Sequence, residues 1–332
     1  MTIPKNILIA TIGSHGDVHP IMALGLGLQQ RGHRVTLIAS AYFESLVREA
    51  GLGFIGLGKP DDYAQTVENP DLWHPTRAFE VVVAYGIRPS IRPIYDIIAQ
   101  QDPANTIVVA SSLVYGARIA HEKLGVPLVT HHLQSSLIRS VYDPPVMGNV
   151  AVPAWWPHWL KRSYFRLLDW GFIDRLLAPE VNRVRAEVGL PPVKSLFGDW
   201  AHSPQKVLCL FPDWFAPPQP DWPANTEMVG FIRYDGAENS TMPPELEAFL
   251  QVGIPHLIMP LSHDQPDNAR LVERLGVGAK LLPKEYRVTA VVEKLNLLLT
   301  SPSVQARCKK VASHIDFEQS LAKACDVIEQ VE

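Results

Sequence analysis

The sequence has little cysteine, and the few it has form no metal or redox motif. Only three occur among the 332 residues, at Cys209, Cys308 and Cys325, and they are too far apart for the short spacings of zinc or dithiol sites. An odd and sparse set of cysteines is typical of a protein kept in a reducing compartment. We therefore expect a cytoplasmic protein without a disulfide framework.

Long hydrophobic runs and an excess of positive charge are also lacking. No uninterrupted apolar stretch reaches the ~18 residues of a membrane-spanning helix, and no small-residue cleavage site follows the first strand, so we expect no signal peptide. The 30 Lys and Arg residues face 34 Asp and Glu residues, which gives a net charge of −4. Without a basic run, neither nucleic acid nor an anionic membrane is an expected partner on composition alone.

Short apolar runs alternate with helical patterns along most of the chain. This alternation is typical of an α/β protein with a doubly wound parallel sheet, and the 47% hydrophobic content suffices for two cores. The predicted strands are 5–12, 33–39, 53–57, 106–111, 127–132, 207–211 and 227–231, followed by 256–260 and 278–282. The predicted helices are 20–30, 78–100, 113–124, 159–188, 244–250 and 266–275.

The pattern divides the chain into two Rossmann-like domains of unequal completeness. We predict a first domain over 1–233, a polar linker over 234–243 and a second domain over 244–332. Only two strands remain after the linker, and a two-stranded parallel sheet cannot bury both of its faces. Either part of the C-terminal domain is missing, or something else covers this sheet.

The loop after the first strand, Gly13-Ser14-His15-Gly16-Asp17, presents polar groups at a strand's carboxyl end. Ligands bind there in α/β proteins, but the glycine spacing and the lack of an acid after the second strand disfavour NAD. Asp17 could accept a proton from a substrate hydroxyl, or it could cap the helix, which we expect to begin near 18–20. His15 and His19 are alternative bases.

A second polar loop, His263-Asp264-Gln265, follows the strand at 256–260. Adjacent carboxylate and amide groups suit hydrogen bonds to sugar hydroxyls, although an Asp before a helix can also be a cap. His131 and His132 end a strand that faces the same crevice. Asp61 and Asp62 have no third ligand nearby, so we expect a solvated loop and no metal site.

Tryptophans are concentrated in the proline-rich segment from 143 to 223. Trp155 and Trp156 stand side by side between Pro153 and Pro157, and Trp159 follows. Rigid aromatic area of this kind suits a long apolar ligand. We predict an apolar acceptor channel that opens beside Asp17; packing in the domain's own core is the alternative.

Several motifs resemble one family. Gly13-Ser-His-Gly-Asp-Val-His-Pro20, Arg31-Gly-His-Arg-Val35 and His263-Asp-Gln-Pro-Asp-Asn268 are similar to bacterial glycosyltransferases of the UDP-glycosyltransferase superfamily, which have the two-domain GT-B fold. Asp71-Leu-Trp-His-Pro75 and Cys209-Leu-Phe-Pro-Asp213 most resemble the rhamnosyltransferases of rhamnolipid synthesis.

The resemblance implies an inverting, metal-independent hexosyltransferase with Asp17 as the base and Asp264 and Gln265 as the sugar-binding pair. Gly13, Ser14, His263 and Asn268 would complete the donor site, and His15, His131, Trp155, Trp156 and Trp159 would hold the acceptor. A dTDP- or UDP-sugar would be the co-substrate, with no further cofactor. The acceptor would be an apolar molecule such as a hydroxy-acyl lipid, which favours peripheral association with the inner membrane. The donor sugar (rhamnose or glucose) and the oligomeric state are left open.

The chain departs from the family at one place. The family's leading donor-domain strands and its His-x-Gly-Gly phosphate motif belong between Leu250 and Gln251, and the sequence contains neither. Residues are therefore either deleted or missing from this sequence, and the activity of the 332-residue form is in doubt. Two other functions stay open, a catalytically impaired acceptor-binding protein and a nucleotide-sugar epimerase on the same fold.

Overall fold

A seven-stranded parallel sheet forms the centre of the computed structural model, which describes residues 4–146, 151–234, 236 and 253–331. The strand order is β3-β2-β1-β4-β5-β6-β7. The strands are β1 (Asn6–Ala10), β2 (Arg34–Ser40), β3 (Gly53–Leu57), β4 (Thr106–Ser111), β5 (Leu128–His132), β6 (Lys206–Cys209) and β7 (Thr226–Met228). All seven strands were predicted from the sequence, and the doubly wound parallel sheet is confirmed.

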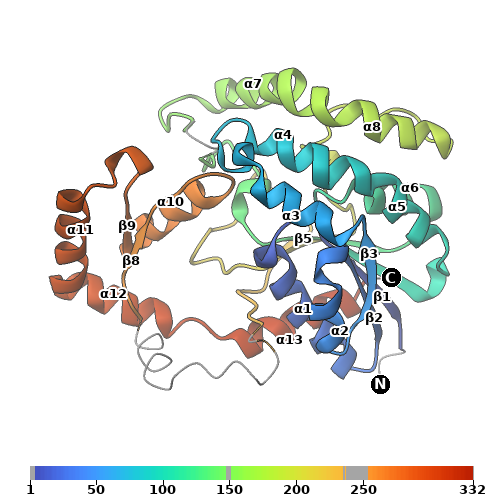
Figure 1. The fold of residues 1–332 in the computed structure, drawn as a ribbon, viewed down its shortest axis with the longest axis horizontal. Coiled ribbons are helices and arrows are strands. Elements are labelled where there is room, and N and C mark those ends of the chain that lie inside the picture. The colour runs from blue at the N-terminus through green and yellow to red at the C-terminus, as the bar shows by residue number, and fades with distance from the viewer. Residues whose placement is uncertain (1–3, 147–150, 235, 237–252, 332) are drawn as a thin grey trace.

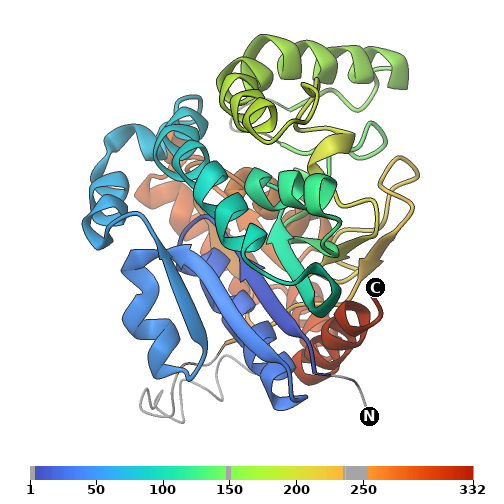
Figure 2. The same ribbon diagram turned by 90° about the vertical axis from the view of Figure 1, so that its right-hand side faces the viewer.

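Helices cover both faces of this sheet (Figures 1 and 2). They are α1 (His15–Gln30), α2 (Glu44–Glu49), α3 (Pro60–Glu68), α4 (Ala78–Val82), α5 (Arg88–Ala99), α6 (Tyr115–Leu124), α7 (His158–Leu168) and α8 (Asp174–Glu187). Alternate strand residues point to opposite faces. Ile7 and Ile9 thus join the core under α1 and α2, whereas Leu8 and Ala10 join the core under α5, α6 and α8.

Two of the predicted helices are interrupted, and one starts earlier than expected. A π-helical turn, Val83–Ile87, separates α4 from α5, and a second, Asp169–Ile173, separates α7 from α8. Helix α1 begins at His15 and not near 18–20, because Ser14 supplies the cap and Pro20 lies inside the helix. This correction moves Asp17 into the first turn of α1.

A smaller unit follows, built on the two-stranded parallel sheet of β8 (His256–Ile258) and β9 (Gly278–Lys280). Helices α10 (Gln265–Leu275), α11 (Val288–Thr300) and α12 (Pro302–Ala312) pack beside it. Its core is small and consists of Val277, Ala279, Leu298, Val304 and Cys308. The junction at Leu250 and Gln251, the predicted helix over 244–250 and most of the predicted linker lie outside the described residues.

The last helix, α13 (Phe317–Glu329), packs on the first unit (Figure 1). Ala324, Cys325, Val327 and Ile328 are buried in the core that contains α1. Arg31, at the end of α1, lies 2.6 Å from Asp326 and 3.0 Å from Glu329. The domain division over 1–233 and 244–332 stays a prediction, but this helix, which it assigns to the second domain, helps to complete the first core.

Candidate functional site

The loop after β1 is shaped by a capping box at the start of α1. The Ser14 side chain accepts a hydrogen bond from Gly16 N, and the Asp17 carboxylate accepts one from Ser14 N at 2.8 Å. This reciprocal arrangement satisfies N–H groups that a helix start leaves without partners. Gly13 has φ +145°, and a Cβ there would lie 2.0 Å from Asp17 Oδ2. Glycine at position 13 therefore allows Asp17 to fold back onto the loop.

Asp17 stays partly accessible beside this cap, and its pKa is shifted. Burial raises the pKa of the carboxyl from 3.8 to about 6, the hydrogen bond from Ser14 N lowers it, and the negative charge of Asp264 raises it. A carboxyl with a pKa near 6 is mostly ionised at neutral pH and still holds a proton well when it receives one. Capping and proton transfer are therefore compatible roles for this side chain.

The second polar loop connects β8 to α10. His263 has a positive φ of 58°, and Asp264 occupies the N-cap of α10 without making a side-chain cap. Its carboxylate instead accepts a hydrogen bond from Asn268 Nδ2 at 2.7 Å, while Gln265 Oε1 accepts one from Leu261 N at 2.8 Å. These bonds fix both side chains of the predicted sugar-binding pair.

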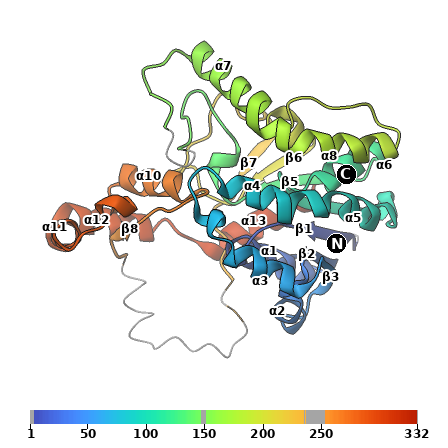
Figure 3. The same ribbon diagram turned by 45° about the horizontal axis from the view of Figure 1, so that its top comes forward.

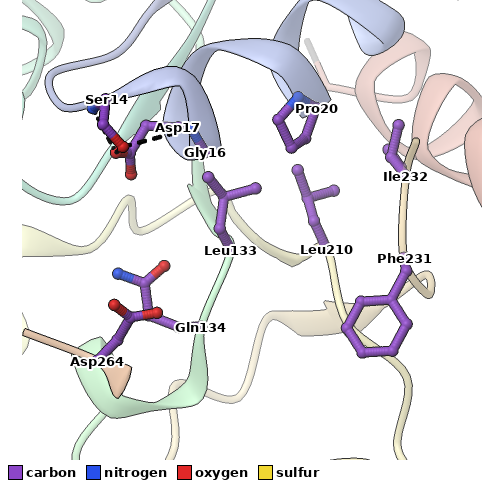
Figure 4. Close-up of a pocket in the computed structure, with 10 residues that line it drawn as sticks. All are labelled: Ser14, Gly16, Asp17, Pro20, Leu133, Gln134, Leu210, Phe231, Ile232 and Asp264. Carbon is purple, nitrogen blue, oxygen red and sulfur yellow. Dashed lines mark hydrogen bonds between the residues drawn. The ribbon is translucent and has the colours of Figure 1, made fainter. Parts of the chain in front are cut away.

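Asp17 and Asp264 face one another across a cleft of about 260 Å³ between the two units (Figure 4). Its polar side is formed by Ser14, Gly16, Asp17, Gln134 and Asp264, and its apolar side by Pro20, Leu133, Leu210, Phe231 and Ile232. The apolar residues outside α1 follow the ends of β5, β6 and β7. Such a crevice at the carboxyl ends of parallel strands is where α/β proteins bind ligands.

Several of these lining residues were not singled out from the sequence. Leu133 and Gln134 follow the end of β5, and Leu210 follows β6. For Leu133 and Gln134 the signal is their position directly after the predicted strand 127–132, because carboxyl ends of parallel strands meet at one edge of a sheet. Leu210 lies inside the predicted strand 207–211, whereas the observed strand ends at Cys209.

A group of aromatic side chains, also missed from the sequence, lies beside Asp17. The His15 ring packs edge-on against Phe43 at 4.9 Å between centroids, and Tyr42 stacks on Tyr63 at 4.5 Å. Burial raises the pKa of Tyr63, and the charges of Tyr42 and Asp17 raise it further, so Tyr63 is close enough to Asp17 to feel its charge. His15 therefore lies near Asp17 within an aromatic group, and its role in acceptor binding stays a prediction.

Ion pairs attach α10, and with it Asp264, to the first unit. Asp143 Oδ1 lies 2.7 Å from Arg270 Nη1, and Asp143 Oδ2 lies 2.7 Å from Arg274 Nη1. Asp267, buried on the same helix, accepts a hydrogen bond from Val146 N at 3.0 Å. These contacts set the distance between the two polar loops.

The remaining predicted acceptor residues are not brought to this cleft. His131 is buried within β5, and burial lowers its pKa to about 4, so it is neutral at physiological pH. Trp155 and Trp159 are 80% and 68% exposed, and Trp156 packs edge-on against Trp155 and Tyr164. The described residues thus show no channel of these tryptophans beside Asp17, and the two exposed indoles are not core residues either.

Metal-ligating side chains do not converge in the part of the chain that the structure describes: no group of three or more His, Cys, Asp or Glu residues could hold an ion there. Among the same residues, no helix combines the length and hydropathy needed to cross a bilayer.

Similarity to a known family gives the class of the N-terminal part. Residues 7–143 match the N-terminal domain of glycosyltransferase family 28. The fold is that of GT-B glycosyltransferases: a solved glycosyltransferase of kitacinnamycin superposes with a TM-score of 0.70 at 16% identity, covering 99% of both chains. The glycosyltransferase VinC, solved in complex with dTDP, superposes with a TM-score of 0.57 at 15% identity, over 98% of this chain and 100% of its own.

Among curated proteins, the chain is similar to the O-mycaminosyltylonolide 6-deoxyallosyltransferase of Streptomyces fradiae. The two are 31% identical over 288 residues, which is 78% of this chain and 62% of the relative. The chain spans 40% and 58% of the lengths of two further glycosyltransferases that it matches. It is thus shorter than these relatives.

Proposed function

We propose that the site belongs to an inverting glycosyltransferase that moves a sugar from a nucleoside diphosphate to a hydroxyl of an apolar acceptor. One observation carries this proposal: Asp17 and Asp264, from the two units, line the same cleft, and the charge of one raises the pKa of the other. The family 28 match over residues 7–143 supports it.

In this reaction Asp17 acts as the general base. Its Oδ2 is held by Ser14 N, which leaves Oδ1 to accept the acceptor's hydroxyl proton. The acceptor oxygen bonds to the anomeric carbon from the side opposite the diphosphate, and the bond between that carbon and the diphosphate oxygen breaks. The nucleoside diphosphate departs with the bonding electron pair, and the sugar is inverted.

Asp264 and Gln265 hold the sugar in this proposal. Each is fixed by one hydrogen bond, from Asn268 and from the Leu261 backbone. The second oxygen of Asp264 and the amide NH₂ of Gln265 then suit the hydroxyls of a hexose. His263 and Asn268 act with this pair by shaping the loop that carries it, and Gly13 and Ser14 complete the donor site from the loop that carries Asp17.

The acceptor binds against the apolar side of the cleft. Leu133, Leu210, Phe231 and Ile232 provide that wall, with Tyr42 and Tyr63 close to Asp17. A hydroxy-acyl lipid with a deoxyhexose donor is our first choice, and a polycyclic acceptor with a glucosyl donor is the second. The Streptomyces fradiae relative is by name a 6-deoxyallosyltransferase, which favours a deoxyhexose donor.

We further propose that residues of the donor domain are missing at the junction of Leu250 and Gln251. Helix α11 is rich in apolar residues, yet Val288, Val292, Leu297 and Leu299 are 50–80% exposed and only Leu298 is buried. An apolar helix face of this size is usually covered. The two-stranded sheet and the greater length of the relatives agree with a missing covering layer.

The second candidate function follows from the same exposed helix. If the deletion is real in the gene, the 332-residue protein is an acceptor-binding protein with impaired transfer, because the phosphate-binding helix that the family places there would supply the N–H donors for the diphosphate. An epimerase has no observation in its favour.

Calorimetric titration of the 332-residue chain with dTDP- and UDP-sugars tests these proposals. We expect very weak donor binding, and restored binding once any sequence found in the gene at 250/251 is included. Low-micromolar donor affinity in the 332-residue chain would refute the missing-layer proposal. A full-length form that releases a 2-epimer and no glycoside would refute the transferase proposal.

A further inference from the structure

The outward side of helix α7 carries a ridge of tryptophan and arginine side chains. We define this α7 outer face by Trp155, Trp159, Arg162, Arg166, Leu167 and Trp170. Trp159, Arg162 and Arg166 follow one another on α7 at intervals of three and four residues, which places them on one side of the helix. Trp155 precedes α7, and Trp170 follows it in the π-helical turn Asp169–Ile173. Leu167 flanks this row.

The opposite side of α7 is firmly packed, which fixes the orientation of the ridge. Phe165 and Asp169 are buried, and Asp169 pairs with Arg139 at 2.7 Å. The Arg139 guanidinium also lies 5.1 Å from the centre of the Phe165 ring. Because the inward side is held in this way, the α7 outer face cannot turn inward.

The apolar part of this face is exposed to an unusual degree. Trp170 and Leu167 are 75% and 62% exposed, close to the values of Trp155 and Trp159. Helix α7 lies in the outermost layer of the first unit, far from α11 (Figures 1 and 3). Large exposed apolar side chains gathered at one place mark an interaction surface.

The charge of the face is of one sign. Arg162 and Arg166 have no carboxylate partner among the described residues, and Asp169, the only acidic residue between 151 and 171, is buried and neutralised by Arg139. Unpaired arginines alternating with indoles complement a layer of anionic headgroups over apolar chains, the boundary at which Trp side chains are enriched.

We propose that the α7 outer face is the surface by which this protein docks on an anionic phospholipid membrane. The indoles enter the headgroup layer while the guanidinium groups bind lipid phosphates, and the helix lies flat on the bilayer. Exposed indoles interleaved with arginines that have no carboxylate partner among the described residues suit a bilayer surface better than a peptide or a globular partner. Docking does not depend on the transfer reaction, so it can be tested in the 332-residue chain without an activity assay.

The test is co-sedimentation with unilamellar vesicles of equal parts phosphatidylcholine and phosphatidylglycerol, compared with phosphatidylcholine alone. We expect binding to the anionic vesicles only, weakened by added salt. Brominated phosphatidylcholine in the anionic vesicles should quench tryptophan emission. Equal binding to both kinds of vesicle, or to neither, would overturn the proposal.

Two variants and two controls locate the surface. Trp155→Ala/Trp159→Ala/Trp170→Ala should weaken vesicle binding about tenfold or more, and Arg162→Gln/Arg166→Gln should weaken it about fivefold per arginine, the equivalent of about 1 kcal/mol each. Arg48→Gln/Arg183→Gln changes two exposed arginines that are already paired with carboxylates. Leu297→Ala/Leu299→Ala removes two exposed leucines of α11.

The controls should bind as the unchanged protein does, and all variants should keep its melting temperature because only exposed side chains change. If the α11 variant loses vesicle binding and the tryptophan variant keeps it, the docking surface lies elsewhere and the proposal fails. Light scattering without vesicles tests whether the α7 outer face binds a second copy of the chain instead of a membrane. A dimer that the tryptophan variant turns into a monomer would show that the face binds a second copy.

Discussion

Asp17 and Asp62 cap their helices in the same way, yet only Asp17 faces Asp264 across the ligand-sized cleft. The carboxylate of Asp17 accepts a hydrogen bond from Ser14 N at 2.8 Å, and that of Asp62 accepts one from Lys59 N at 2.7 Å. Asp62 is exposed on α3. Comparing variants of Asp17 and Asp62 therefore distinguishes the stability that a capping carboxylate contributes from the effect of the cleft on the pKa of Asp17.

The first prediction concerns stability against pH. Because burial and Asp264 raise the folded-state pKa of Asp17 to about 6 from 3.8, the stability that its proton contributes is fully present below about pH 4 and is lost as pH rises through 6. Asp17→Asn cannot ionise and still caps, so its melting temperature should exceed that of the unchanged protein at pH 8 but not at pH 4.

Asp62→Asn is the matched control, because it changes a carboxylate that accepts the same kind of bond from the N-cap backbone at an exposed position. The higher melting temperature at pH 8 should be specific to Asp17→Asn. A similar rise in the melting temperature of both variants, or a lower melting temperature of Asp17→Asn at pH 8, would contradict the raised pKa of Asp17.

The second prediction concerns turnover in a form of the enzyme that is active. Asp17→Asn should reduce kcat by ~10²–10⁴-fold with donor affinity unchanged, the usual contribution of a general base. In the unchanged enzyme, kcat/KM should fall as pH drops below about 6, because protonated Asp17 cannot accept a proton. If Asp17→Asn turned over normally while His15→Ala or His19→Ala was inactive, the base would be that histidine.

Asp264→Asn provides a third prediction. The negative charge of Asp264 raises the pKa of Asp17, so its removal should move the acidic limb of the pH profile to lower pH. Donor KM should also rise, since Asp264 is proposed to hold the sugar. A pH profile identical to that of the unchanged enzyme would mean that the two carboxylates do not interact.

The fourth prediction concerns the attachment of α10. Asp143→Ala removes a carboxylate that binds both Arg270 and Arg274 in a half-buried setting. We expect a loss of about 1–3 kcal/mol in the free energy of unfolding, the range for a broken charged hydrogen bond. Glu44→Ala breaks the exposed pair with Arg48 and should cost less than about 1 kcal/mol. Denaturant titration measures both, and equal losses would contradict a special role for Asp143.

The last prediction concerns the docking of α13 on α1. A Cβ at Gly27 would lie 3.0 Å from Leu321 and 3.2 Å from Cys325, so Gly27→Leu should cost about 1–3 kcal/mol through overpacking. Gly171→Leu is the control, because a Cβ there meets nothing within 4 Å. If α13 packs less firmly on α1, the chain between α12 and α13 should be cleaved faster by protease in Gly27→Leu and not in Gly171→Leu. An unchanged cleavage rate in both variants would contradict the expectation.

The sheet and both polar loops could be predicted from the sequence because they depend on local signals. Apolar runs located all seven strands of the main sheet, and Gly13-Ser14 marked the carboxyl end of the first one. The sequence places the start of α1 too late because Pro20 is typical of a helix's first turn, whereas Ser14 followed three residues later by Asp17 carries a capping-box signature.

The positions of the tryptophans could not be predicted in this way. Their periodicity shows that Trp159 and Trp170 share a helix face, but not which face is turned inward. That depends on the burial of Asp169 against Arg139, a contact between residues 30 positions apart. Likewise, the group of His15, Tyr42 and Tyr63 forms only when three separate elements meet.

Because α13 returns to the first core, the smaller unit is joined to it by two stretches of chain, one after Tyr234 and one between α12 and α13. The ion pairs of Asp143 with Arg270 and Arg274 form a third, non-covalent attachment beside the cleft. The position of Asp264 relative to Asp17 therefore depends on all three attachments. The same double attachment lets the smaller unit lose or gain residues while the chain on both sides of it stays part of one folded core.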